Sequence, residues 1–496
     1  MKAPSVQYSI TIRLEIPARP TGVSEVTTAV EDSGAMVTGL DVNHSDQEMV
    51  RIDLTCSTSN AEHAKDVVES IRAVPQVKII RVSDRTFLAH LGGKIKIESK
   101  VPIRNRDDLS LVYTPGVARV CEAIVAEPED ARNLTIKRNT VAVVSDGSAV
   151  LGLGNIGPLA ALPVMEGKAA LFKRFADIDA FPICLDTQDT EEIIQAVKNI
   201  APNFAGINLE DISAPRCFEI EDRLRGILDI PVFHDDQHGT AIVALAALRN
   251  ALRVVKKDLS KVKIVLSGAG AAGTAILKLL MKAGAKNVVV ADVNGVVHKG
   301  RDKMNESLEW IAANTNPKNF TGTLKQALKG ADVFIGVSAP NVVGPKDLLS
   351  MADDPIVFAM ANPNPEIDPA VATKYAAVVA TGRSDYANQI NNVLAFPGFF
   401  RGLLDAQSKT ITDEMLLAAS EALADMVADE QLNANYIIPS VFNADVSQNV
   451  SRAVQAAVEA TEGKHAVSED SVTPPALRKR KTKKATEAKT TKATKG

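Results

Sequence analysis

A glycine-rich turn between a strand and a helix constrains the fold of this 496-residue chain more than any other feature. Residues 262–267 form an apolar run that predicts a strand, and residues 274–283 have the apolar spacing of a helix. Glycines in the turn let the backbone approach a pyrophosphate, which then lies at the N-terminus of the helix. The sequence therefore predicts a dinucleotide-binding site at Gly268, Gly270, Ala271, Ala272 and Gly273.

An acidic residue at the end of the next strand indicates which dinucleotide binds. Residues 287–291 predict that strand, and Asp292 follows it, nineteen residues after Gly273. A carboxylate at this place binds the 2′-hydroxyl of the adenosine ribose and repels a 2′-phosphate. NAD is therefore favoured over NADP, although the nearby cations Lys299 and Arg301 keep NADP as the alternative.

Strands and helices that alternate around this turn predict the fold class. Hydrophobic residues make up 46% of the chain and aromatic residues only 4%, which fits an α/β protein better than an all-β protein. We expect a Rossmann-type doubly wound NAD-binding domain at residues 243–462 and an α/β substrate and metal-binding domain at residues 89–242. Residues 463–496 are mostly Lys, Thr, Ala and Pro, and we expect them to form a disordered Lys-rich tail.

Residues 1–88 have a different pattern, in which the order of predicted elements is βαββαβ. This is the order of a ferredoxin-like split-βαβ domain. The pattern resembles the ACT domain, a small regulatory module, and the resemblance implies a small-molecule effector. The alternative is a ferredoxin-like appendage that serves dimer packing. The strands are expected near residues 6–14, 35–40, 48–56 and 77–82, and the helices near residues 22–32 and 61–73.

Charge and cysteine usage argue against several classes of protein. The formal net charge is −4, and the residues from Ser471 onward include nine Lys or Arg and one Glu, so the rest of the chain is more acidic than the total. An acidic body does not indicate a nucleic-acid-binding fold. The four cysteines form no CxxC pair, which argues against zinc and fits reduced thiols. No signal-peptide pattern and no run of about 20 apolar residues is present, so we expect a cytoplasmic protein without a membrane span.

Two pairs of adjacent carboxylates stand at the ends of predicted strands. Glu210 and Asp211 follow one strand-like run, and Asp235 and Asp236 follow another, before a helix predicted at residues 240–255. Either pair alone is better explained as a helix cap or a solvated strand end. Two pairs upstream of one dinucleotide site predict a binding site for Mg²⁺ or Mn²⁺, which prefer oxygen ligands.

Two further segments carry side chains suited to proton transfer. Tyr113 stands directly before a Thr-Pro-Gly turn, and Lys168 lies in the otherwise apolar stretch 163–172. Without other information, Lys168 would be interpreted as a surface lysine whose stem packs on apolar neighbours.

Together these segments resemble the malic enzymes, in their shorter bacterial form with an N-terminal ACT-like domain. The resemblance covers residues 90–445. It rests on the motifs Tyr-Thr-Pro-Gly-Val-Ala, Leu-Gly-Leu-Gly-Asn-Ile-Gly, Met-Glu-Gly-Lys, Asn-Leu-Glu-Asp, Phe-His-Asp-Asp-Gln-His-Gly-Thr, Ala-Asn-Pro-Asn-Pro-Glu and Asn-Asn-Val-Leu-Ala-Phe-Pro-Gly.

The resemblance implies an activity and a set of metal ligands. The implied reaction is oxidative decarboxylation of (S)-malate to pyruvate and CO₂ with reduction of NAD, and also decarboxylation of oxaloacetate. By the same resemblance, Glu210, Asp211 and Asp236 bind the divalent cation. The family also implies a homodimer or a larger homo-oligomer.

The resemblance also assigns the catalytic residues. Lys168 is expected to be the general base and Tyr113 the general acid, and Asn362 and Asn391 are expected to contact substrate or cofactor. We expect Asp235 to hold Lys168 in position and the pKa of Lys168 to be depressed, since a base must accept a proton near neutral pH.

One departure from the family pattern leaves a question open. Longer members carry an arginine just before the Leu-Gly-Leu-Gly motif to bind the substrate carboxylate, whereas this chain has Ala149 there. Three alternative functions remain at this stage. They are a malolactic enzyme that keeps NADH bound, an ACT-regulated amino-acid dehydrogenase that needs no divalent cation, and a non-enzymatic ligand-sensing scaffold.

Overall fold

The described residues form two sheets of mainly parallel strands and one separate antiparallel sheet. The computed structural model describes residues 5–463, and it divides the chain into two units, Met1–Glu98 and Ser99–Gly496. The predicted α/β fold class, with a Rossmann-like sheet and an N-terminal βαββαβ domain, is confirmed. The predicted tail at residues 463–496 lies, apart from Gly463, outside the described residues.

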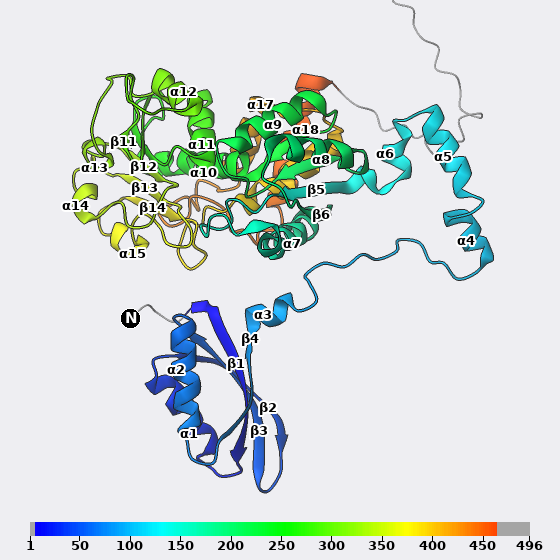
Figure 1. Cartoon of the computed structure of the whole chain (residues 1–496). Coiled ribbons are helices and arrows are strands. Elements are labelled where there is room, and N and C mark those ends of the chain that lie inside the picture. The colour runs from blue at the N-terminus through cyan, green and yellow to red at the C-terminus, as the bar shows by residue number, and fades with distance from the viewer. Residues whose placement is uncertain (1–4, 464–496) are drawn as a thin grey trace, which may run out of the picture. The chain divides into compact units, whose positions relative to one another are not determined.

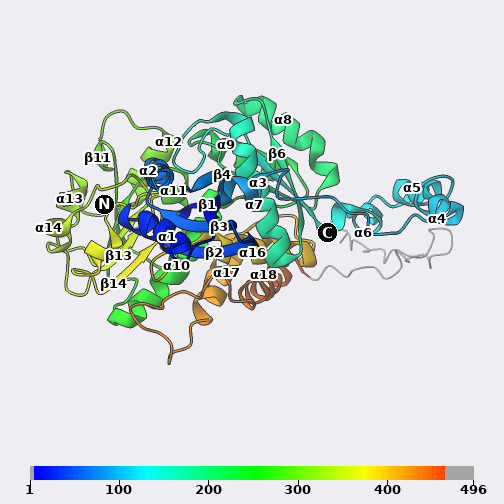
Figure 2. The ribbon, with the colours of Figure 1, turned by 90° about the horizontal axis from the view of Figure 1, so that it is seen from below.

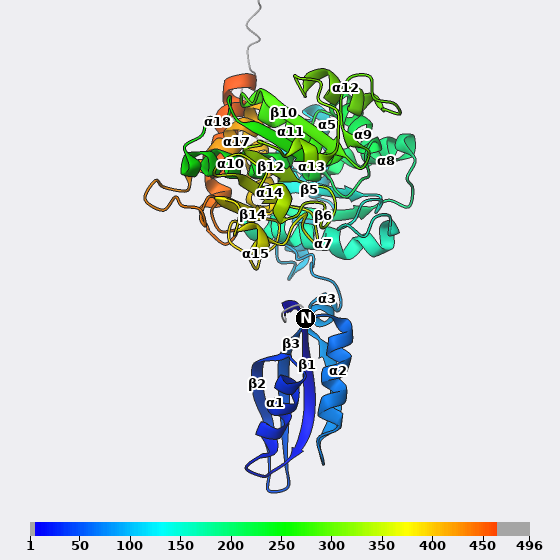
Figure 3. The ribbon, with the colours of Figure 1, turned by 90° about the vertical axis from the view of Figure 1, so that its left-hand side faces the viewer.

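The N-terminal unit has a four-stranded antiparallel sheet in the order β2-β3-β1-β4. Apolar residues of the central strands, such as Ile12 and Leu54, are fully buried beneath the two helices. Figures 1 and 3 show α1 and α2 side by side along the sheet. The elements are β1 (Ser5–Pro17), α1 (Gly22–Asp32), β2 (Met36–Ser45), β3 (Met49–Thr58), α2 (Ala61–Arg72), β4 (Lys78–Asp84) and α3 (Arg85–His90).

The second unit begins with three short helices that carry many exposed side chains. They are α4 (Arg106–Val112), α5 (Val117–Ala126) and α6 (Asp130–Leu134). By length and composition alone, Arg106–Ala126 qualifies as a candidate membrane span, which is weak evidence. In the structure this stretch is two helices, because α4 ends before the turn at Tyr113–Gly116.

A four-stranded parallel sheet follows, in the order β6-β5-β7-β8. All of its strands run in the same direction, so their carboxyl ends meet at one edge, where ligands bind in open α/β sheets. Its strands are β5 (Thr140–Ser145), β6 (Asp179–Cys184), β7 (Gly206–Leu209) and β8 (Val232–His234), and its helices are α7 (Gly157–Ala176), α8 (Thr190–Ile200), α9 (Arg216–Ile227) and α10 (Asp235–Val255).

The six-stranded sheet has the order β11-β10-β9-β12-β13-β14, with β11 antiparallel and the other pairs parallel. Such an order, with the first strand β9 in the middle, places the glycine-rich turn at the point where the strand order reverses. The strands are β9 (Lys263–Ser267), β10 (Asn287–Asp292), β11 (Gly295–Val296), β12 (Val333–Gly336), β13 (Ile356–Ala359) and β14 (Val378–Thr381). The helices include α11 (Ala271–Lys282), α12 (Glu306–Asn314), α13 (Leu324–Ala327), α14 (Pro345–Leu348), α15 (Pro369–Ala372), α16 (Phe396–Ala406), α17 (Asp413–Asp425) and α18 (Val446–Glu462).

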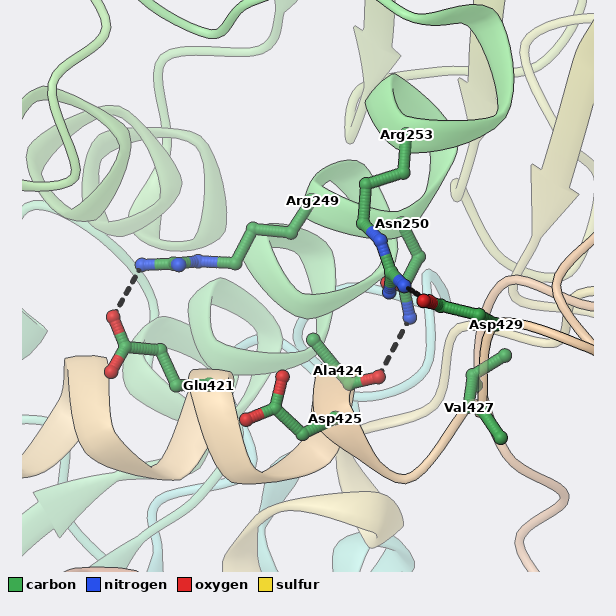
Figure 4. Close-up of a pocket in the computed structure, with 9 residues that line it drawn as sticks. Arg249, Asn250, Arg253, Glu421, Ala424, Asp425, Val427 and Asp429 are labelled. Carbon is green, nitrogen blue, oxygen red and sulfur yellow. Dashed lines mark hydrogen bonds and ion pairs between the residues drawn. The ribbon is translucent and has the colours of Figure 1, made fainter.

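Helix α10 links the two parallel sheets, and its C-terminal half is fixed against α17. The buried Asn250 donates hydrogen bonds to the carbonyls of Ala424 and Ile437, at 2.9 and 3.0 Å. Arg249 pairs with Glu421 across a pocket of about 340 Å³ between the two helices, as Figure 4 shows. The predicted domain boundary at residues 242–243 falls inside this continuous helix and remains a prediction.

Candidate active site

Three carboxylates gather where β7 and β8 end. Glu210 and Asp211 follow β7, and Asp236 lies in the first turn of α10, directly after β8. Because β7 and β8 are adjacent parallel strands, these carboxylates meet at one sheet edge. One oxygen from each lies within 4.8 Å of the others. Helix α10 begins at Asp235, several residues before the predicted start, because acidic side chains favour the positive end of a helix.

The electrostatics of this cluster suit a divalent cation. Burial and the neighbouring carboxylates raise the pKa of Asp211 to about 8, and burial also raises the pKa of Glu210 well above its usual value. Oδ2 of Asp211 is buried and has no hydrogen-bond partner among the described residues. Three mutually repelling oxygen donors are the ligand set that Mg²⁺ and Mn²⁺ prefer, so the residues fit such an ion.

Lys168 lies between this cluster and Asp235. The lysine projects from the middle of α7, is only 8% exposed, and places its Nζ 2.5 Å from Oδ2 of Asp235 and 3.0 Å from Oε1 of Glu210. Burial alone would lower the pKa of Lys168, but the carboxylates of Asp235 and Glu210 outweigh burial and raise that pKa above its ordinary value. The expected depression of the pKa is therefore absent here, because sequence reasoning counted the cation and not these carboxylates.

Sequence reasoning missed three residues that surround Lys168 and Asp235. Nδ2 of Asn392 donates a hydrogen bond to Oδ2 of Asp235, and the ring of Phe396 lies 4.3 Å from Nζ of Lys168. A Cβ on Gly239 would lie 2.0 Å from Oδ1 of Asp235, so only glycine leaves room for this carboxylate. Asn392, Phe396 and Gly239 all lie within the motifs that resemble the family. Nothing in the sequence, however, indicates that they lie close to Asp235 or Lys168.

A second buried network supports the start of α10. Glu221 accepts hydrogen bonds from the side chains of Gln237 and His238, at 2.9 and 2.8 Å, and pairs with Arg225. Burial alone would raise the pKa of Glu221, but His238 and Arg225 outweigh it and lower that pKa to about 2. A stable negative charge here fixes the helix turn that carries Asp236.

The glycine-rich turn has the geometry of a dinucleotide cradle. Gly268 has φ +114°, and a Cβ at Gly273 would lie 2.0 Å from the carbonyl oxygen of Gly268. A Cβ at Gly270 would meet no described atom within 4 Å, which leaves open space beside the turn. Gly270 is the N-cap of α11, and Ala271 and Ala272 form its first turn. These residues fit the pyrophosphate of NAD.

The two asparagines predicted to contact substrate or cofactor lie in different surroundings. Asn362 follows β13, and its carbonyl oxygen would lie 2.5 Å from a Cβ on Gly152, so the two loops approach closely. The side chain of Asn391 instead accepts a hydrogen bond from the backbone of Val393 and caps a short 3₁₀-helix. Ala149 donates its backbone N–H to the carbonyl of Asp211 at 2.9 Å, so this position borders the carboxylate cluster.

Tyr113 is the one predicted catalytic residue that the single chain does not bring to this cluster. It follows α4 and is 65% exposed. Figures 1 and 2 both place α4 and α5 away from α7, the helix that carries Lys168. In the structure, Lys168 therefore contacts the carboxylates, whereas Tyr113 lies away from them.

Comparisons with protein families and with individual proteins agree on one enzyme family. Residues 237–460 match the family described as "Malic enzyme, NAD binding domain", residues 92–192 and 187–225 match "Malic enzyme, N-terminal domain", and residues 4–81 match "ACT domain". The NAD-dependent malic enzyme of Geobacillus stearothermophilus is 57% identical over 90% of this chain and 93% of its own length. The bifunctional malic/malolactic enzyme of Bacillus subtilis is 54% identical over 74% of this chain and 90% of its own.

A solved structure agrees with these matches. The NAD-dependent malic enzyme of Thermotoga maritima superimposes with a TM-score of 0.73 at 51% identity, covering 75% of this chain and 99% of that chain. The carboxylate cluster, the buried lysine and the glycine-rich turn therefore belong to a chain of the malic enzyme family that also carries an ACT domain.

Proposed function

We propose that this protein catalyses the NAD-dependent oxidative decarboxylation of (S)-malate to pyruvate and CO₂. The observation that carries the proposal is the position of Lys168, whose ammonium contacts both Asp235 and Glu210 beside two further metal-binding carboxylates. The similarity to NAD-dependent malic enzymes supports the choice of substrate and cofactor. The same site would decarboxylate oxaloacetate, which is the intermediate of the reaction.

The proposed reaction assigns a role to Lys168, to Tyr113 and to the three clustered carboxylates. Lys168 accepts the proton of the C2 hydroxyl while a hydride leaves C2 for the nicotinamide. Loss of CO₂ from the resulting β-keto acid leaves an enolate, and Tyr113 donates a proton to its C3 to give pyruvate. The divalent cation on Glu210, Asp211 and Asp236 would supply Lewis-acid stabilisation of the negative charge that forms when CO₂ departs.

The raised pKa of Lys168 is compatible with this role. Its cause is the negative charge of Asp235 and Glu210. A cation that engages Glu210 and Asp236 adds positive charge beside the ammonium, which lowers the pKa of Lys168 towards that of a base. Asp235 keeps the Nζ in place, and its Oδ2 also accepts a hydrogen bond from Asn392.

The exposed position of Tyr113 leads us to propose a homodimer in which each site is completed by the partner. Helices α4 and α5 expose Leu109, Leu111 and Val125, which is an apolar surface that a second copy would bury. A pocket of about 550 Å³, lined largely by apolar residues that include Leu159 and Leu162, opens at the N-terminal end of α7. Docking of α4 and α5 on this end of α7 in a second copy would bring Tyr113 towards the partner's active site.

Mixed dimers test this arrangement. Tyr113→Phe and Lys168→Ala subunits are each inactive, but a mixed dimer retains one complete site if Tyr113 acts on the partner. Refolding equal amounts together should recover roughly a quarter of wild-type activity. The matched control mixes Lys168→Ala with Asp236→Asn, two changes within the same site, and should recover nothing. Recovery no greater than the sum of the parents would place Tyr113 in its own subunit's site.

The malolactic reaction is the second candidate, because a relative of 54% identity has both activities. The two reactions differ in their products, since a malolactic enzyme retains NADH and releases lactate. Incubation with malate, NAD and Mn²⁺, followed by measurement of pyruvate, lactate and free NADH, separates them. We expect pyruvate and NADH in equal amounts, and lactate without free NADH would support the malolactic reaction instead.

Three further proposals concern the metal ion, the ligand of the ACT domain and the cellular location of the enzyme. We propose Mg²⁺ or Mn²⁺ as the ion, on the oxygen-only donor set. We propose that the ACT domain binds a small-molecule effector, and that the enzyme acts in the cytoplasm. The amino-acid dehydrogenase and the ligand-sensing scaffold are disfavoured by the metal cluster and the complete set of catalytic side chains.

A further inference from the structure

The loops that follow β12 and β13 lie at the same sheet edge as the glycine-rich turn. Strands β9, β12 and β13 are adjacent and parallel, so their carboxyl ends share this edge. A dinucleotide bound where the strand order reverses extends to both sides of that point. Its adenosine half lies towards β10, which ends at Asp292, a residue paired with Arg301. The loops after β12 and β13 are therefore the loops on the nicotinamide side.

One fully buried carboxylate, that of Glu366, joins these two loops. Its Oε1 accepts a hydrogen bond from the backbone N–H of Ser338, in the loop after β12, at 2.8 Å. Its Oε2 accepts one from the backbone N–H of Ala361, in the loop after β13, at 3.1 Å. The backbone N–H of Asn341 also donates to the carbonyl of Pro365 at 3.2 Å. The two loops are thus hydrogen-bonded to each other around Glu366.

The same carboxylate is connected to the strand that leads into the glycine-rich turn. The hydroxyl of Ser338 donates to Oε1 of Glu366 at 3.4 Å, and it lies 2.8 Å from the hydroxyl of Ser267, the last residue of β9. A Cβ on Gly336 would lie 2.4 Å from Cδ of Glu366, so only glycine lets the carboxylate approach the end of β12. These close contacts hold the glutamate in one place.

Asn362 directly follows Ala361, so its position depends on these hydrogen bonds. A Cβ on Gly382 would lie 3.2 Å from both Nδ2 and Oδ1 of Asn362, which shows that the amide lies against the chain after β14. The carbonyl oxygen of Asn362 lies against Gly152 in the loop before α7. Loss of the bond from Ala361 to Glu366 would therefore move Asn362 relative to both neighbours.

The hydrogen-bond partners of this carboxylate in the described part of the chain are uncharged N–H and O–H groups. Burial raises the pKa of Glu366, and the N–H donors of Ser338 and Ala361 oppose this rise. A buried acid without a cationic partner is unfavourable for folding by itself. Its place at the ligand-binding edge of the sheet therefore indicates a role in the site.

We propose that Glu366 is a positioning residue for the nicotinamide half of the site: its carboxylate fixes the loops after β12 and β13, and through Ala361 it orients Asn362. The inference rests on the NAD-dependent function proposed above. It assigns to Glu366 an effect on the nicotinamide half of the dinucleotide and none on the adenosine half.

Two ligands that share only the adenosine diphosphate part test this proposal. Glu366→Gln keeps the size of the side chain but has one acceptor oxygen, so it loses at least one of the two N–H bonds. NADH is titrated by fluorescence and ADP by calorimetry, without malate or metal. The affinity for NADH should fall roughly tenfold, which corresponds to one hydrogen bond, while the affinity for ADP should not change. In malate oxidation, kcat should fall even when both substrates are saturating.

Asp332 provides a matched control at the opposite edge of the same sheet, directly before β12. Its Oδ2 accepts a hydrogen bond from the backbone N–H of Lys263 and its Oδ1 one from Nζ of Lys257, each at 2.8 Å. Asp332→Asn should lower Tm and leave both affinities unchanged. If Glu366→Gln does not fold, Ser338→Ala replaces it, and this milder change should weaken NADH binding by a smaller factor without an effect on ADP.

Two results would overturn the proposal. One is an equal loss of affinity for NADH and ADP in Glu366→Gln, and the other is unchanged NADH binding at a lowered Tm. Either would show that Glu366 supports only the fold, and unchanged NADH binding by Ser338→Ala would have the same meaning. Failure of the wild-type protein to bind NADH would instead contradict the proposed function, so the two failures are distinguishable.

Discussion

Lys168 and Asp235 form a buried ion pair, with Nζ of the lysine 2.5 Å from Oδ2 of the aspartate. The same Nζ lies 3.0 Å from a carboxylate oxygen of Glu210. One ammonium therefore contacts both the carboxylate proposed to position it and a carboxylate proposed to bind the metal. This contact couples the proposed proton acceptor to the metal site, so that changes at either should affect the same chemical step.

Replacement of the lysine should abolish proton acceptance without affecting the dinucleotide turn. Lys168→Ala should lower kcat by about 10²- to 10⁴-fold, the usual contribution of a general base. Affinity for NADH, measured by fluorescence, should stay unchanged. The control is Lys173→Ala, a change of an exposed lysine on the same helix that pairs only with surface aspartates. Near-wild-type malate oxidation by Lys168→Ala would refute the assignment of the base.

Gly239→Ala should inactivate the enzyme although alanine favours helices. The added Cβ would lie 2.0 Å from Oδ1 of Asp235 and 3.2 Å from Cβ of Asn392, so Asp235 must move and release Lys168. Gly226→Ala is the matched control, because a Cβ there would meet no described atom within 4 Å. We expect Gly226→Ala to keep full activity and to stabilise the fold by up to about 1 kcal/mol. Equal activity of the two variants would contradict the proposed role of Asp235.

Substitution of the adjacent residues Asn391 and Asn392 by alanine should have different effects. Asn392→Ala removes the hydrogen bond to Asp235, and we expect kcat to fall about tenfold or more, with a shifted pH profile. Asn391→Ala removes the cap of a 3₁₀-helix, and we expect a loss of stability of about 1 kcal/mol, visible as a lower Tm. If Asn391→Ala raises KM or lowers kcat at unchanged Tm, the original prediction that Asn391 contacts substrate or cofactor is supported.

Metal binding should release protons and weaken at acid pH. The folded protein holds the pKa of Asp211 at about 8, so this carboxylate carries a proton near neutral pH before a cation binds, and burial also raises the pKa of Glu210. Protons and cation compete for the same oxygens, and the affinity for Mn²⁺ should therefore fall as the pH drops below about 8. Calorimetry in buffers of different ionisation enthalpy measures the protons released. A pH-independent affinity between pH 6 and about 8 would contradict these raised pKa values.

The sequence predicted which carboxylates meet in the site, but it did not predict the distances between the side chains around them. Glu210, Asp211 and Asp236 meet as expected, because carboxyl ends of adjacent parallel strands share an edge and this follows from strand order alone. The raised pKa of Lys168 depends on its distances to Asp235 and Glu210, which no sequence pattern contains, whereas the predicted depression of this pKa assumed a bound cation.

The residues that the sequence did not predict are those that contact Asp235 and Lys168 from a distant segment of the chain. Asn392 and Phe396 reach the site from a segment more than 150 residues away from Asp235, and only the folded chain shows which of two adjacent asparagines points inward. The exposure of Tyr113 could not be predicted either, since the motif around it indicates its chemistry and not its distance from Lys168 in the folded chain.

The most direct test of the account is malate oxidation by metal-free enzyme before and after addition of Mn²⁺. Enzyme dialysed against EDTA is mixed with malate and NAD, and NADH is followed at 340 nm while pyruvate is quantified. We predict no NADH without metal, full activity with one NADH per pyruvate after Mn²⁺ is added, and no recovery in Asp236→Asn. Undiminished NADH formation by the metal-free enzyme would contradict the central claim that Glu210, Asp211 and Asp236 hold a catalytic cation.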